Sequence, residues 1–221
     1  MTSNEQIIYQ PIFLLFVGIS LLLTLGYFWG RRWNRQIMLS ALNDLMSIVQ
    51  PDDQTFTNIG GAIGHHANLF VRRKGAPFSR VDATITLLPR HSWLYLPISK
   101  FFRKYDRLFI TLYLKQPPRE EAHLIENSYS RFMGSKILNA GRLNHETVAW
   151  GKLSFHLYFA SLSMRDKMLR FIGDNPDPGI VRHIAIVPDQ KKGFVFMVPL
   201  KEQVARYFAP IYRWMPAASR E

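Results

Sequence analysis

Two adjacent histidines, His65 and His66, are the first residues whose type suggests chemistry, either as metal ligands or as an acid–base pair. Neighbouring side chains on a strand point to opposite faces, so the two rings cannot share one ligand position there. No carboxylate or third histidine follows at a spacing that would complete a zinc site. The pattern favours a polar pair in a loop and predicts no metal site.

Other candidate catalytic patterns are incomplete. The segment GGAIG, with Gly60, Gly61 and Gly64, lacks the Lys-Ser/Thr that follows the glycines of a phosphate-binding loop. Asp52 and Asp53 follow the helix-ending Pro51 and are expected to form a cap or turn. The sequence contains no cysteine and no serine-hydrolase or zinc-protease motif. We therefore expect a protein that is not an enzyme, with no cofactor and no small-molecule substrate.

An enzyme assembled from distant residues is the alternative. A membrane-tethered enzyme acting on lipids or nucleotides would need a deep pocket that gathers polar side chains such as His65, His66, Asp82 and His91. His156 and His183 alternate with apolar residues in expected strands, which predicts that both face solvent.

Basic residues are the more prominent feature. The chain has 28 Lys and Arg against 16 Asp and Glu, a net charge of +12, and every Lys and Arg lies after residue 30. Such an excess favours anionic partners: lipid headgroups, RNA or an acidic protein. The candidate contacts for an anionic partner are Arg72, Arg73, Lys74, Lys100, Arg103, Lys104, Arg107, Lys191 and Lys192.

The segment that positions these residues is the apolar run from Ile12 to Trp29, which contains no charged side chain. In a helix it would measure about 27 Å, close to the hydrocarbon thickness of a bilayer. A basic cluster follows the run and none precedes it, which is the reverse of a cleavable signal peptide. We expect an uncleaved anchor with the N-terminus outside and the rest of the chain in the cytoplasm. The expected aromatic belt and flanking cations are Tyr27, Phe28, Trp29, Trp33, Arg31, Arg32 and Arg35.

The sequence divides into four expected parts: a short outer N-terminus (1–9), a transmembrane helix (10–30), a juxtamembrane amphipathic helix (31–51) and a basic cytoplasmic domain (52–221). Met38, Leu42, Leu45 and Val49 form one stripe of the second helix, which predicts packing on the domain.

Within the domain, periodicity predicts alternating strands and helices. Strand–helix–strand units are expected at 80–114 and 153–187, a helix near 122–134, and a hairpin of two strands before a final helix. Ser163 is the expected N-cap of the helix in the second unit. The fold class is α+β: an N-terminal transmembrane helix and a two-layer α/β sandwich built from β-α-β units.

The order of these segments resembles a known family. The anchor leads into GRRWNRQIMLSALNDLMSIV, followed by DATITLLPRHSWLYLPISKFFRKYDRLFITLYLK, KLSFHLYFASLSMRDKMLRF and VRHIAIVPDQKKGFVFMVPLKEQVARYFAPIYRWM. This pattern resembles calumin, the single-pass subunit of the PAT complex of the multipass translocon. The sequence lacks the acidic region before the anchor and the long basic C-terminal helix of that family, so contact with the ribosome tunnel is not carried over.

The resemblance implies a scaffold or chaperone subunit that assists membrane-protein insertion or folding near the Sec channel and the ribosome. Its expected partners are the membrane, a Sec-type translocon or another membrane complex, and the ribosome or its RNA. A structural subunit of an envelope complex is a further alternative, separated from the first by the identity of its partners.

Overall fold

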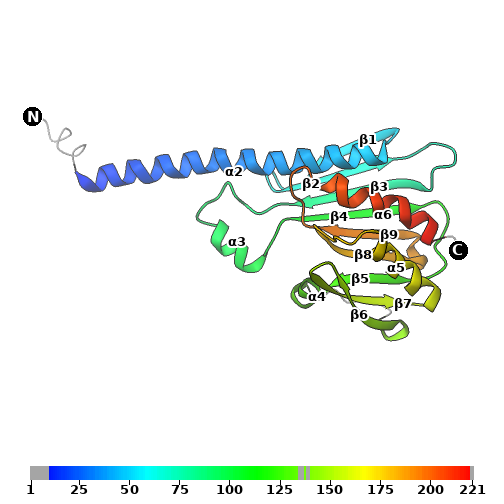
Figure 1. Ribbon diagram of the computed structural model, residues 1–221. Coiled ribbons are helices and arrows are strands. Elements are labelled where there is room, and N and C mark those ends of the chain that lie inside the picture. Colours follow the sequence, from blue (N-terminus) through cyan, green and yellow to red (C-terminus); the bar gives the residue numbers. More distant parts are fainter. Residues whose placement is uncertain (1–9, 134–136, 138–139, 220–221) are drawn as a thin grey trace, which may run out of the picture.

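A long helix and a broad β-sheet make up the protein (Figure 1). The computed structural model describes residues 10–133, 137 and 140–219. The helices are α2 (Pro11–Val49), α3 (Leu96–Phe102), α4 (Asn127–Met133), α5 (Leu162–Asp174) and α6 (Val204–Ala218). The strands are β1 (Asp53–Asn58), β2 (Gly64–Phe70), β3 (Phe78–Thr86), β4 (Arg107–Leu114), β5 (Ala122–Glu126), β6 (Asn144–Trp150), β7 (Leu153–Phe159), β8 (Val181–Val187) and β9 (Lys192–Met197).

The described strands form one nine-stranded sheet in the order β1-β2-β3-β4-β9-β8-β5-β7-β6, and every neighbouring pair is antiparallel. The two expected β-α-β units have different strand arrangements in this sheet. In the first, β3 and β4 are adjacent antiparallel strands, and α3 lies on the connection between them. In the second, β7 and β8 both pair with β5, so they run in the same direction with β5 between them. The α+β class is confirmed.

Helices α2, α5 and α6 cover one face of the sheet and enclose the main core (Figure 1). Val81, Ala83 and Ile85 alternate with half-buried residues along β3 and point into this core, as the period-two pattern predicts. Helix α4 lies on the opposite face, where Tyr129 packs with Ile125 and Phe196 in a smaller cluster.

Helix α2 continues without a break from the exposed apolar run into the domain core. Its second half buries Leu42, Leu45 and Val49, so the predicted packing of this stripe is confirmed. Two side chains of α2 also accept hydrogen bonds from backbone amides at the start of α6. Ser40 Oγ accepts the Glu202 amide at 2.8 Å, and Asp44 Oδ2 accepts the Ala205 amide at 3.0 Å. A carboxylate at a helix N-terminus is favourable because free amides meet it there.

Three expectations about local structure were wrong. Residues 122–126 form strand β5 instead of the start of a helix; all five are buried, so no alternation marks them. The expected loop pair His65–His66 lies in strand β2. The N-cap of α5 is Ser161, whose Oγ accepts the Met164 amide at 3.1 Å, and not Ser163. Strands β1 and β6 were not anticipated; their residues are mostly exposed, so burial imposes no apolar alternation on them.

Candidate functional site

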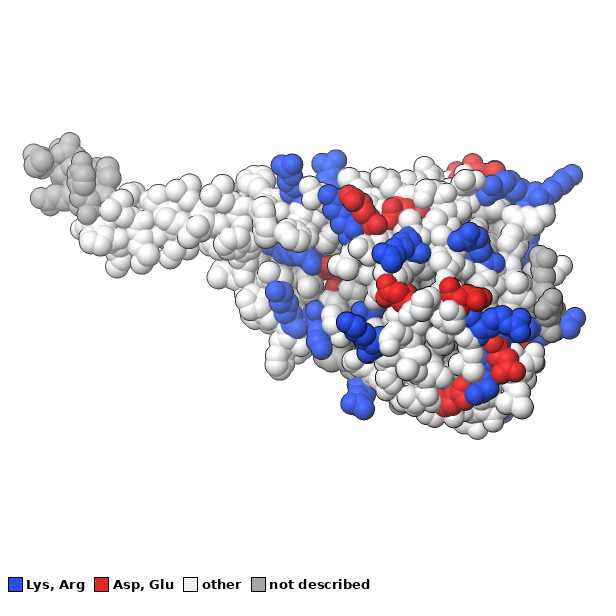
Figure 2. Space-filling view, in the orientation of Figure 1, with Lys and Arg blue, Asp and Glu red and all other residues white. Residues whose placement is uncertain are grey.

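The exposed half of α2 is the clearest candidate for a functional surface. An 18-residue window of this helix has a mean hydropathy of 2.2, and only 6% of the window is buried. By length and composition the helix could cross a membrane. The predicted belt residues lie at the end of the apolar run nearest the domain and are exposed: Tyr27 by 39%, Phe28 by 63%, Trp29 by 55% and Trp33 by 46%. Arg31, Arg32 and Arg35 are also exposed. Figure 2 shows Lys and Arg side chains around the point where the helix meets the domain.

Two glycines let the β3–β4 connection approach α2 closely. A Cβ atom at Gly30 would collide with the backbone carbonyl of Arg90, and one at Gly26 would overlap the indole of Trp93. The rings of His91 and Tyr27 pack edge to face, with their centroids 5.8 Å apart. The small-xxx-small spacing of Gly26 and Gly30 is typical of close helix packing in membranes, so the sequence carried a signal for this contact.

A buried polar cluster fixes the same junction. The guanidinium of Arg90 makes two hydrogen bonds to Asp106, at 2.9 and 2.6 Å, and one to Asn34 Oδ1 at 3.0 Å. Asp106 also accepts the Leu88 amide at 2.7 Å, and Asn34 donates to the Leu88 carbonyl at 2.9 Å. Asn34 and Asp106 are only 1% and 5% exposed. Buried polar groups of this kind are stable only when paired, so the cluster acts as a clamp between α2 and the β3–β4 connection.

Short helix α3 projects from this connection, at the end of the domain from which α2 emerges (Figure 1). Pro97 lies in its first turn, where a residue without a backbone N–H loses no intrahelical hydrogen bond. Lys100 in this helix and Arg103 and Lys104 just after it are exposed, and Arg107 begins β4. Burial, with the nearby charge of Arg103, lowers the pKa of Arg107. We call Lys100, Arg103, Lys104 and Arg107 the proximal basic group.

The other predicted cations lie at the opposite end of α2. Arg73 donates to the Val49 and Gln50 carbonyls at 2.8 and 2.9 Å, so it caps the C-terminus of this helix. Arg72 pairs with Asp53 at 2.8 Å. The backbone carbonyl of Lys191 accepts a hydrogen bond from the Leu114 amide. The next residue, Lys115, donates from its Nζ to the Arg73 carbonyl at 3.0 Å, so Lys191 lies near Arg73.

We call Arg72, Arg73, Lys74, Lys191 and Lys192 the distal basic group. From Gly30 to Val49, the helix separates the two groups by about 28 Å. The nine predicted cations therefore form two surfaces instead of one. Figure 2 shows Lys and Arg at both ends of the domain.

The four residues named for a polar pocket are not brought together. His65 pairs with Ile85 on the core face of the sheet, whereas His66 bonds Thr84 Oγ1 at 2.8 Å on the other face. Asp82 forms an ion pair with Arg80 at 2.9 Å, and His91 lies against α2. Burial lowers the pKa of His65. Among the described residues no group of three His, Asp or Glu could hold a metal ion.

His183 is half-buried instead of fully exposed, because the rings of Tyr129 and His123 lie beside its ring on the sheet face opposite the main core. Burial, with the nearby ring of His123, lowers the pKa of His183 to about 3. His156 is half-buried and bonds His145 at 3.0 Å.

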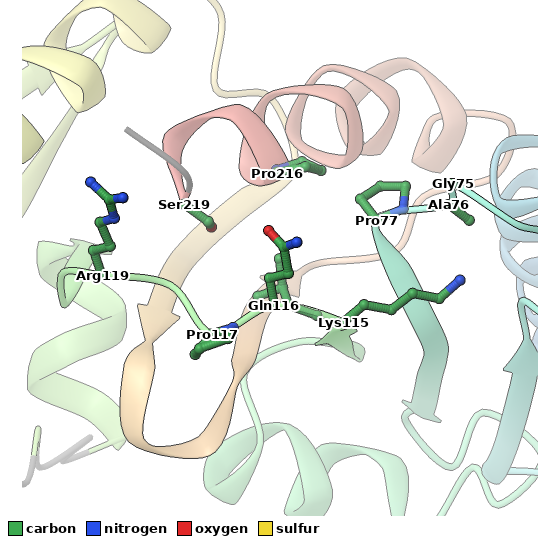
Figure 3. A pocket seen from close by; sticks show the side chains of 10 residues that line it. Gly75, Ala76, Pro77, Lys115, Gln116, Pro117, Arg119, Pro216 and Ser219 are labelled. Atoms are coloured by element: carbon green, nitrogen blue, oxygen red, sulfur yellow. The ribbon is translucent and has the colours of Figure 1, made fainter.

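A surface cavity of about 370 Å³ lies between the start of β3, the end of β4 and the C-terminal turn of α6. Figure 3 shows Gln116 pointing into it, while Lys115 and Arg119 extend away from it. The remaining lining is mostly proline and small residues: Gly75, Ala76, Pro77, Pro117, Pro216 and Ser219. The charged residues of its lining are Lys115 and Arg119, and the described lining includes no Asp, Glu or His, so we make no catalytic assignment there.

Sequence reasoning missed Gly26, Gly30, Asn34, Arg90 and Asp106, which together position the junction of α2 with the domain. Only the glycine spacing gave a local signal. In the sequence, Arg90 lies 56 positions after Asn34, and Asp106 lies 16 positions after Arg90, so no local pattern connects them.

Comparisons with known proteins give little further guidance. No protein-family model matches the chain, and no curated protein matches it. Among solved structures, the crystal structure of the mycobacterial trehalose monomycolate transport factor A, TtfA, has a TM-score of 0.44 and 12% sequence identity. The match covers 82% of this chain and 95% of that chain. A likeness at this level establishes neither a shared fold nor a shared function.

Proposed function

We propose that this protein is a non-enzymatic, single-pass membrane scaffold, with its N-terminus outside and its α+β domain on the cytoplasmic face. One observation carries the proposal: α2 is a single helix whose first half is apolar and exposed and whose second half belongs to the domain core. An apolar helix surface of this length in water would expose far more hydrophobic area than a soluble domain tolerates.

The attachment is rigid, which distinguishes a scaffold from a loosely tethered domain. No flexible linker separates the exposed half of α2 from the half that packs beside β2 and α6. The buried clamp of Asn34, Arg90 and Asp106 and the contacts of Ser40 and Asp44 to α6 hold that second half in place. The domain would therefore keep a fixed height and orientation above the bilayer.

The charge distribution supports the orientation and suggests the partners. Arg31, Arg32 and Arg35 follow the apolar run, as the positive-inside rule requires for a cytoplasmic domain. The proximal basic group would face anionic headgroups. The distal basic group, about 28 Å further along α2, would face a soluble anionic partner.

With the resemblance to calumin, we propose that this partner is ribosomal RNA near a Sec-type channel, and that the protein assists membrane-protein insertion or folding. Crosslinking in native membranes, followed by affinity purification and mass spectrometry, tests this role. Recovery of Sec-channel subunits and ribosomal proteins is expected. A matched pair of variants sharpens the test: Lys74→Gln with Lys191→Gln should reduce ribosome recovery, whereas Lys100→Gln with Lys104→Gln should not. Absence of both partners from the crosslinked material would refute the biogenesis role.

Topology can be measured separately because the chain contains no cysteine. Single cysteines at Ser3 and Arg220 should react with a membrane-impermeant maleimide in intact cells only at position 3. Labelling at position 220 instead would show that the orientation is the reverse of the one proposed. If neither position reacts in intact cells but both react after lysis, the proposal that α2 spans the surface membrane is refuted.

A further inference from the structure

The connection between β3 and β4 is much longer than its geometry requires. These strands are adjacent and antiparallel, and a tight turn could join them. Residues 87–106 instead leave the sheet, reach α2, form α3 and return. Long connections of this kind in compact domains are usually functional.

The exposed side chains of this excursion are those that a soluble surface avoids. Phe101 is 81% exposed, and six large apolar or aromatic residues lie within ten positions: Trp93, Leu94, Tyr95, Ile98, Phe101 and Phe102. The buried residue of α3 is Ser99, at 5%. The usual arrangement of a surface helix is thus inverted, with serine against the protein and phenylalanine outward. Clustered apolar exposure marks a binding surface.

The position of the excursion along α2 identifies what it meets. Trp93 packs on Gly26, which lies inside the uncharged run, and Arg90 packs on Gly30 at its end. The aromatic residues are therefore level with the inner end of the proposed span. Tryptophan and tyrosine are enriched at this depth, where rings lie among headgroups. Lys100, Arg103 and Lys104 are suited to reach outward from this level toward anionic headgroups.

We propose that residues 93–102 form a second membrane contact, in which the apolar side chains around α3 insert into the cytoplasmic interface of the bilayer beside the anchor. The inference rests on the proposed membrane span of α2. Lipid fits better than a protein partner, because the exposed apolar side chains precede α3 and continue along it instead of lining one groove. Two contacts set apart would also stop the domain from rotating or tilting about a single helix.

Quenching by spin-labelled lipid tests the contact in the full-length protein. Single cysteines at Ile98, Phe101, Leu22 and Lys74 would carry an environment-sensitive fluorophore in nanodiscs of phosphatidylcholine and phosphatidylglycerol. We expect a shallow lipid quencher to quench positions 98 and 101 severalfold more than position 74. A quencher at the chain ends should act most strongly on position 22, in the middle of the proposed span.

The outcomes separate the two proposals. If position 22 is quenched but positions 98 and 101 remain open to aqueous iodide, the second contact is wrong and the anchor stands. If positions 98 and 101 resist both lipid quencher and iodide, a protein covers them and the lipid contact is refuted. If position 22 also escapes the lipid quenchers, the membrane span itself fails.

A matched substitution adds a second measurement. Phe102→Ser, in the protein labelled at Ile98, should shift the emission toward that of an aqueous environment and weaken the shallow quenching. Phe56→Ser removes another exposed phenylalanine, from strand β1, and should change neither. Equal effects of the two substitutions would overturn the assignment. Both residues are exposed, so neither substitution is expected to unfold the domain.

Discussion

Replacing Asp106 by alanine tests whether the clamp holds α2 to the domain. The carboxylate of Asp106 is 6% exposed and accepts two bonds from Arg90 and one from the Leu88 amide. Its removal leaves a guanidinium that is 19% exposed beside an unsatisfied backbone amide. Breaking a buried ion pair by deleting one partner costs about 3–5 kcal/mol. Arg90 keeps its bond to Asn34, so we expect the lower end, about 3 kcal/mol.

Asp53 supplies the matched control, because it also pairs with one arginine, Arg72, at 2.8 Å. The side chains of that pair are 51% and 73% exposed, and an exposed pair contributes about 0–1 kcal/mol. Asp53→Ala should therefore change stability little. For a domain of this size, a loss of 3 kcal/mol at Asp106 corresponds to a fall in melting temperature of about 6–12 °C.

Melting curves of the full-length protein in mild detergent, followed by tryptophan fluorescence, would measure both variants. Asp106→Asn keeps an acceptor for the Leu88 amide but loses the charge, so its melting temperature should lie between those of the native protein and Asp106→Ala. Hydrogen exchange of residues 87–106 should accelerate in Asp106→Ala before that of the central strands. Equal melting temperatures for Asp53→Ala and Asp106→Ala would refute the clamp.

Three further predictions concern the stability of the domain: a glycine substitution, the dependence on pH, and the loss of a helix-capping arginine. Gly30→Leu should destabilise the domain by about 1–3 kcal/mol, because the new Cβ atom would collide with the Arg90 backbone. Gly18→Leu is the control, because open space surrounds that position, and it should not destabilise the domain. Similar melting temperatures for the two variants would contradict the close contact. His183 stays neutral in the folded state, with a pKa near 3, while the unfolded chain gains a proton below about pH 6.5. Stability should therefore fall from about pH 6.5 toward 3, by up to about 1.4 kcal/mol per pH unit, and His183→Leu should flatten this dependence in denaturation measured at several pH values. Arg73→Met should cost about 1 kcal/mol in the same assay, because the C-terminal carbonyls of α2 lose a donor, and Lys74→Met should cost less.

Local patterns predicted much of the secondary structure. The alternation of Val81, Ala83 and Ile85 marked β3, and the period of Leu42, Leu45 and Val49 marked the buried stripe of α2. Both succeed because one face of each element is buried and the other is not. Strand β5 is buried throughout and strand β1 is exposed throughout, so neither carries an alternation that sequence could reveal.

The candidate site divides in the same way. The exposed apolar run, its aromatic end and the following arginines were predictable because hydropathy and charge are properties of consecutive residues. The close approach of the β3–β4 connection to Gly26 and Gly30 was not, because it depends on the return of the chain from β3 to α2. Deciding whether Phe101 is a core residue or an exposed one required that geometry.

The sequence by itself determined that this protein has a charge-free apolar helix, a basic remainder and alternating strands, since each of these is written in neighbouring side chains. The tertiary structure alone decided the strand order, the clamp of Asn34, Arg90 and Asp106, and the separation of the basic residues into proximal and distal groups. These features join residues far apart in the chain. Their pairing is selected by packing and by the need of buried polar groups for partners, and local periodicity does not encode it.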